Sequence, residues 1–146
     1  MARIRTIKPE WRDEAAFAGL FFGEGHIDLV KQGSTTRGLS VRLRIALRDD
    51  DRAVLDWVVS LYGGCLYPRE ATRSWCWQLT GRDRVLAVLR VLESSPIPSK
   101  KKREVALAIE AAHLTPQRGR HLTDQAAQAM LDLRSRLKSG RVYGAH

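Results

Sequence analysis

A single acidic residue, Glu24, ends an apolar stretch that begins at Phe17 and is followed by Gly25. Gly19 and Gly23 are four residues apart, so on a helix they share a face and leave no side chain to hold a second helix away. Glu24 would then lie where two backbones approach each other most closely. There its carboxylate and the backbone carbonyl of Gly23 are hard oxygen ligands suited to a divalent cation. An ordinary core helix that ends in glycine is the alternative interpretation.

This stretch resembles the signature motif of the LAGLIDADG homing endonucleases. Phe17 stands at the first leucine of the motif, and Glu24 stands at its catalytic acid. Between them, Ala18, Gly19 and Leu20 match, whereas the phenylalanines occupy positions that tolerate variety in the family. The resemblance implies site-specific hydrolysis of phosphodiester bonds in double-stranded DNA, with Mg²⁺ or Mn²⁺ as the cofactor. It also implies a gene within an intron or intein, or a free-standing phage or bacterial gene.

Charge and composition narrow the class of partner. The chain carries 25 lysines and arginines against 16 aspartates and glutamates, a net charge of +9 over 146 residues. This excess favours a polyanion, most simply nucleic acid. No run reaches the roughly 18 apolar residues that a membrane span requires, so we expect a cytoplasmic protein with no membrane partner. The two cysteines lack CxxC spacing and predict reduced thiols.

Hydrophobic periodicity predicts two copies of a helix followed by a β-hairpin, and then a third helix. The predicted elements are a helix at 13–24, strands at 25–31 and 39–48, a helix at 49–62, strands at 65–69 and 74–80, and a helix at 82–93. This αββαββα order predicts an α+β fold in which a four-stranded antiparallel sheet carries helices on one face. It is also the order of the LAGLIDADG fold.

The rest of the chain predicts further helices. Two prolines between residues 94 and 99 indicate a short linker, a helix is expected at 99–113, and a last helix begins at Thr123. We expect residues 1–114 to form the endonuclease-type core, with a short basic segment at 1–12. Residues 115–146 are expected to form a helical extension of the same domain.

One copy of the acid motif has a consequence for assembly. Cutting both strands of a duplex requires two active sites, so we expect a homodimer that acts on a pseudo-palindromic target. Two copies of the first helix would pack together, and two adjacent carboxylates are tolerated where cations lie beside them. The predicted interface residues are Ala18, Gly19, Phe22 and Gly23. Members of the family with a single motif are similarly homodimers.

A basic run begins the helix that follows the linker. Its members are Lys100, Lys101, Lys102 and Arg103. The family places a lysine here that reaches the active site and stabilises charge on the phosphate or polarises water. Lys101 aligns best with that catalytic lysine, and Lys100 is the second choice. A solvated basic turn is the alternative for each of the four.

Strand alternation predicts a sheet face that bears polar and basic side chains opposite an aliphatic face. We expect this face to contact DNA, because a two-stranded ribbon fits the major groove. The candidates in the first hairpin are His26, Asp28, Val30, Gln32, Arg37 at the loop tip, Ser40, Arg42, Arg44 and Arg48. Those in the second are Tyr67, Arg69, Arg73, Ser74, Cys76 and Gln78. Arg42, Arg44 and Arg69 are the strongest candidates for guanine or phosphate contacts.

The sequence therefore predicts a homodimeric, metal-dependent, site-specific DNA endonuclease. A non-cleaving nucleic-acid-binding protein on the same scaffold, such as an intron maturase or a transcription regulator, is the alternative. Retention of Glu24 argues against loss of cleavage. The arginine-bearing hairpins favour DNA over structured RNA, which would be recognised more by its shape and phosphates.

Overall fold

The computed structural model of the chain describes residues 8–31, 39–116 and 122–142. Its elements are α1 (Trp11–Glu24), β1 (Gly25–Lys31), β2 (Leu39–Arg48), the 3-10 turn η1 (Asp49–Asp51), α2 (Arg52–Tyr62), β3 (Cys65–Arg69), the 3-10 turn η2 (Glu70–Thr72), β4 (Ser74–Leu79), α3 (Arg82–Ser94), α4 (Lys101–Leu114) and α5 (Asp124–Val142). The predicted αββαββα order is confirmed, with α4 and α5 following it. The hairpin loop expected at 32–38 lies outside the described residues.

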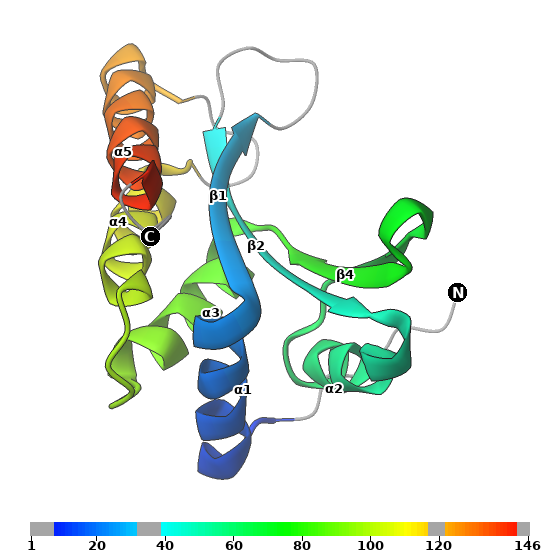
Figure 1. Cartoon of the computed structure of the whole chain (residues 1–146). Helices are drawn as coiled ribbons and strands as arrows, with labels where there is room; N and C mark the ends of the chain where they lie inside the picture. The colour runs from blue at the N-terminus through cyan, green and yellow to red at the C-terminus, as the bar shows by residue number, and fades with distance from the viewer. Residues whose placement is uncertain (1–7, 32–38, 117–121, 143–146) are drawn as a thin grey trace.

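The four strands form one antiparallel sheet in the order β1-β2-β4-β3. The two hairpins therefore meet through the pairing of β2 with β4. Figure 1 shows the helices on one side of this curved sheet, with α4 and α5 at the left and α1, α2 and α3 below it. The opposite face carries no helix in the described part of the chain (Figure 1). The predicted α+β layout with one covered face is confirmed.

Alternation in β2 separates the two faces of the sheet. Leu39, Val41, Leu43 and Ile45 are buried, whereas the residues between them are partly exposed. Each such buried aliphatic side chain contributes about 1.5–3 kcal/mol relative to its exposed state, so a one-residue slip in register would be costly. The pattern of the sequence thus determines which face of the sheet remains open to a ligand.

Helix α1 is attached to the sheet by aromatic packing. The ring of Phe17 lies 4.6 Å from that of Tyr62, at the end of α2, and 6.0 Å from that of Trp77 in β4. The indole of Trp77 also donates a 2.8 Å hydrogen bond to the carbonyl of Gly63. At its start, α1 begins two residues earlier than predicted because the Asp13 carboxylate accepts the backbone N–H of Glu10.

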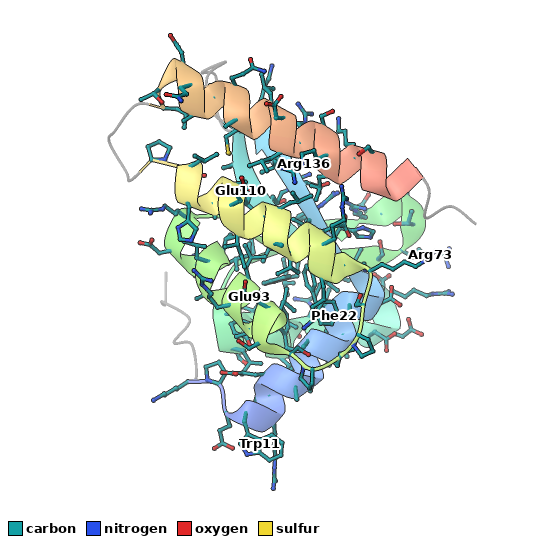
Figure 2. The ribbon with its side chains drawn as sticks, turned by 90° about the vertical axis from the view of Figure 1, so that its left-hand side faces the viewer. Trp11, Phe22, Arg73, Glu93, Glu110 and Arg136 are labelled. Carbon is teal, nitrogen blue, oxygen red and sulfur yellow. The ribbon has the colours of Figure 1, made fainter. Side chains whose placement is uncertain are left out.

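Helix α5 packs beside α4, as Figures 1 and 2 both show. Its buried side chains Met130, Leu133 and Leu137 belong to the same hydrophobic cluster as the core of the sheet. Trp11, at the start of α1, lies at the end of the molecule opposite α5 (Figure 2). None of the described helices is long and apolar enough to cross a membrane.

Candidate active site and nucleic-acid interface

The junction between α1 and β1 places Glu24 at the edge of the sheet. Glu24 is the last residue of α1 and is exposed, and β1 begins at the next residue. Gly25 makes this direct passage possible, because a Cβ there would lie 2.5 Å from the ring of Phe21 and 2.6 Å from its carbonyl oxygen. Its φ of −81° is ordinary, so close packing and not backbone conformation requires glycine.

Lys101 reaches the same end of α1 from another part of the chain. Its Nζ donates a 2.7 Å hydrogen bond to the carbonyl of Gly25 and a 3.5 Å bond to that of Phe21. The start of α4 positions it, since the Ser99 hydroxyl accepts the backbone N–H of Lys101. An ammonium at a helix C-terminus interacts favourably with the negative end of the helix dipole. A cation and the Glu24 carboxylate are thereby brought to one helix end.

The other members of the basic run point elsewhere. Lys102 donates to the carbonyls of Glu93 and Ser95, at the end of α3. Arg103 donates to the carbonyl of Arg136 in α5 at 3.2 Å. Lys100 is exposed and precedes the helix. Of the two lysines that the sequence left open, the structure thus places Lys101 at the end of α1.

The chemistry of this helix end suits a hard divalent cation. Glu24 offers a carboxylate, and the carbonyl of Gly23 belongs to the last turn, where carbonyls have no intrahelical partner. Within the described ranges, no three His, Cys, Asp or Glu side chains gather closely enough to hold a metal ion. Glu24 and the Gly23 carbonyl would by themselves supply only part of a coordination shell. This fits Mg²⁺, which keeps several waters and takes only one or two carboxylates.

Between residues 15 and 23, the exposed positions of α1 are all occupied by small residues. Ala15, Ala16, Gly19 and Gly23 are exposed and recur at three- and four-residue spacing. A Cβ built on Gly23 would have no atom within 4 Å, and one on Gly19 would meet only Ile97 Cδ1 at 3.9 Å. Packing within the chain therefore requires neither glycine.

Two other predicted interface residues, Ala18 and Phe22, do not belong to this exposed row of small residues. Ala18 is fully buried in the protomer's own core, so its assignment to a dimer interface is wrong. The helical phase that exposes Gly19 and Gly23 turns Ala18 toward Phe17 and Phe21 on the buried side. Phe22 is partly buried, and the Lys102 ammonium lies 5.9 Å from the centre of its ring.

The uncovered face of the sheet carries most of the predicted DNA contacts. By strand register, Asp28 lies opposite Arg42, and His26 lies opposite Arg44, which in turn faces Gln78. A second row joins three residues across β2, β4 and β3, and its members are Arg48, Ser74 and Arg69. Val30 lies opposite Ser40 at the far end of β1, and Arg73 is exposed in the turn before β4. Gln32 and Arg37 lie outside the described residues.

Cys76 does not fit its predicted role. Alternation places it on the uncovered face, between Ala46 and Tyr67, yet its side chain is 0% exposed. Its thiol cannot reach a ligand, so the prediction of a DNA contact is wrong. The neighbouring Tyr67 is partly buried and interacts with Arg69, whose pKa is raised above its ordinary value mainly by a hydrogen bond with Tyr67.

An ion-pair cluster on this face was not foreseen from the sequence. The Oδ2 atom of Asp28 accepts hydrogen bonds from Arg44 Nε at 3.0 Å and from Arg42 Nη2 at 3.4 Å. Arg44 Nη2 lies 2.8 Å from the same oxygen. The signal was present in the hairpin pattern, because all three residues alternate onto one face of two adjacent strands.

Comparison with known proteins bears on the fold. No protein-family model matches the sequence, and no curated protein matches it significantly. Many solved structures do match. The meganuclease I-SmaMI, bound to uncleaveable DNA, has a TM-score of 0.73 at 18% identity. That match covers 88% of this chain and 45% of I-SmaMI, so the chain spans about half the length of this relative.

Two smaller relatives are matched over most of their length. The homing endonuclease I-CvuI, in complex with a DNA target, has a TM-score of 0.71 at 17% identity, covering 88% of this chain and 82% of I-CvuI. The homing endonuclease I-TnaI has a TM-score of 0.70 at 17% identity, covering 94% of this chain and 99% of I-TnaI. The I-AabMI structure that also matches is described as a LAGLIDADG meganuclease. The chain therefore has the fold of the LAGLIDADG homing endonucleases.

Proposed function

We propose that the protein belongs to the LAGLIDADG family and is a site-specific double-stranded DNA endonuclease that acts as a homodimer with Mg²⁺ or Mn²⁺. The observation that carries this proposal is the hydrogen bond of Lys101 to the carbonyl of Gly25, the residue that follows Glu24, at the edge of an arginine-bearing sheet face. The matched structures of I-SmaMI and I-CvuI are DNA complexes, which supports a DNA partner for this fold.

Each site residue has a separate role in the proposed hydrolysis of the phosphodiester bond. Glu24 and the Gly23 carbonyl would hold the divalent ion, which when bound polarises a phosphate oxygen and lowers the pKa of a water ligand. Lys101, oriented by the Gly25 carbonyl, places positive charge where negative charge develops on the phosphate. Water would serve as the nucleophile, forming one bond to phosphorus as the bond from phosphorus to the leaving oxygen breaks, so no nucleophilic side chain would be required.

The exposed face of α1 supports the homodimer. An ordinary exposed helix face carries charged or long polar side chains, whereas from residue 15 to residue 23 this one carries alanines at 15 and 16 and glycines at 19 and 23. Two such faces can approach closely about a two-fold axis, which would bring two Glu24 residues together above one duplex. A two-fold dimer in turn favours a pseudo-palindromic target.

The remaining residues of the uncovered face are the proposed DNA contacts. The described members retained from the sequence prediction are His26, Asp28, Val30, Ser40, Arg42, Arg44, Arg48, Tyr67, Arg69, Arg73, Ser74 and Gln78. Gln32 and Arg37 remain predictions. With β1 and β2 as a two-stranded ribbon, side chains from successive outward positions would follow successive bases of the major groove.

Cleavage of a randomised duplex library tests the proposal. Wild-type protein and Glu24→Gln are incubated with the library with and without Mg²⁺, and the new DNA ends are sequenced. We expect cuts at one preferred sequence with wild-type protein and Mg²⁺ only, while Glu24→Gln retains the same sequence without cutting it. Sequence-selective retention by wild type with no cutting would refute the nuclease and favour the non-cleaving alternative.

A further inference from the structure

The charged cluster of Asp28, Arg42 and Arg44 lies on the face that the proposed function assigns to DNA. A carboxylate on such a face repels phosphates and lowers the affinity for DNA, so its presence there calls for a separate role. Here it bonds to two arginines at once. Asp28 keeps 19% of its side-chain surface exposed, and each arginine keeps 25%. The pairs are therefore less screened by solvent than ion pairs on an open surface.

Arg44 bonds to Asp28 through one defined edge of its guanidinium group. Asp28 Oδ2 contacts both Nε and Nη2 of its guanidinium, so the carboxylate occupies the side edge of that planar group. The edge formed by Nη1 and the outer N–H of Nη2 is then directed away from Asp28. That edge has the paired donors that match O6 and N7 of guanine in the major groove. Arg42 is held through a single, longer contact of 3.4 Å.

We infer that Asp28 is a positioning residue that orients Arg44 to recognise a guanine. This inference rests on the proposed DNA-binding function and refines it, because Asp28 acts through Arg44 and not on the base. Fixing the guanidinium before DNA arrives removes part of its rotamer freedom in advance, which favours one bonding geometry over many. The charge of Asp28 also reduces repulsion between Arg42 and Arg44.

The inference predicts two effects of opposite sign. Asp28→Asn removes the negative charge with little change in size, so phosphate attraction and non-specific affinity increase. The same change replaces a charge-assisted hydrogen bond to Arg44 by a weaker one, so Arg44 is held less firmly and base discrimination at one position decreases. Loss of fold would decrease both quantities, which distinguishes positioning from a merely structural role.

Selection of bound sequences tests the inference. The full chain carrying Glu24→Gln, which prevents cutting, is incubated with a randomised duplex library, and bound DNA is sequenced. We expect a guanine preference at one position of each half-site that Arg44→Ala abolishes. Asp28→Asn should weaken that preference about tenfold at that position alone. It should also raise affinity for random duplex with a steeper salt dependence.

A matched control uses an ion pair away from this face. Asp56 pairs with Arg52 at 3.9 Å on α2, and both are exposed, so Asp56→Asn should leave the selected sequence and the salt dependence unchanged. If the parent selects no sequence, the proposed function fails, and this inference fails with it. If the parent selects a sequence but Asp28→Asn keeps the full guanine preference, or loses every preference together, the inference alone is overturned.

Discussion

Substitution of Gly23 by alanine tests whether glycine on α1 is needed for packing within the protein or for contact with a second copy. Within the protomer, the new methyl group would meet no atom within 4 Å, and the residue lies in a regular helix. Alanine is favoured over glycine in a helix interior by about 0.5–1 kcal/mol. The isolated protomer should therefore keep its free energy of unfolding or gain up to that amount.

The expected effect on the dimer has the opposite sign. A two-fold axis introduces the methyl group twice at the proposed contact between the two α1 helices. Each extra group in a closely packed contact costs about 1–3 kcal/mol, which gives roughly 2–6 kcal/mol for the pair. At about 1.4 kcal/mol for each factor of ten, the dimer dissociation constant should rise roughly 30-fold to 10⁴-fold. Gly19→Ala should act similarly, because Ile97 lies at an ordinary contact distance.

Two measurements on each variant check this reasoning. Sedimentation equilibrium gives the dimer dissociation constant, and chemical unfolding at concentrations below that constant gives the stability of the protomer. Ala106→Ser, on an exposed position of α4, is the control; it should leave the dissociation constant unchanged and lower the stability of the protomer by no more than about 0.7 kcal/mol, the difference in helix propensity. An unchanged dissociation constant in a well-folded Gly23→Ala protein would refute α1 as the interface. A less stable protomer would show that the site is not open.

Two further predictions concern single side chains. Lys101→Ala should reduce the cleavage rate about 10²- to 10³-fold while DNA affinity changes little, as expected for a group that stabilises developing charge. The control variant Lys100→Ala should cut at the wild-type rate. Single-turnover kinetics and equilibrium binding measure the two quantities. Burial, helped by the charges of Glu14 and Asp13, raises the pKa of Tyr62 from 10.0 to about 12. The unfolded chain loses this proton first, so the Tyr62 contribution to stability is complete below pH 10 and is lost as the pH rises toward 12. In the described structure the Tyr62 hydroxyl is buried without a hydrogen-bond partner, so Tyr62→Phe should leave the free energy of unfolding at pH 7 unchanged or slightly higher. The same substitution should make stability fall less steeply above pH 10. Urea unfolding at several pH values would expose a contrary result.

Prediction of the site was less complete than prediction of the fold. Lys100 and Lys101 are equivalent in type and adjacent in sequence, yet neighbouring helical residues point about 100° apart. Which of them reaches Gly25 depends on the start and direction of α4 relative to α1, a relation set by packing between segments more than seventy residues apart. Sequence alignment with the family motif favoured Lys101 as the catalytic lysine, and that role stays a prediction.

Two predictions failed because the burial of single residues was not foreseen. The motif placed Ala18 beside Gly19 in sequence, but the sheet packs against the face of α1 that carries Ala18. Strand alternation placed Cys76 on the uncovered face, but alternation gives the direction of a side chain and not what its neighbours cover. Both errors arise because exposure depends on contacts that are distant in sequence.

The sequence by itself determined the order of helices and strands, the open and covered faces of the sheet, and the single acid at the end of α1. These follow from local periodicity, since alternation and helical spacing depend on residues only a few positions apart. The tertiary structure alone decided that Lys101 bonds to the carbonyls of Phe21 and Gly25, that Ala18 and Cys76 are buried, and that Asp28 holds two arginines at once. Those outcomes depend on how separate elements pack and on rotamers in a crowded surface, which no local pattern specifies.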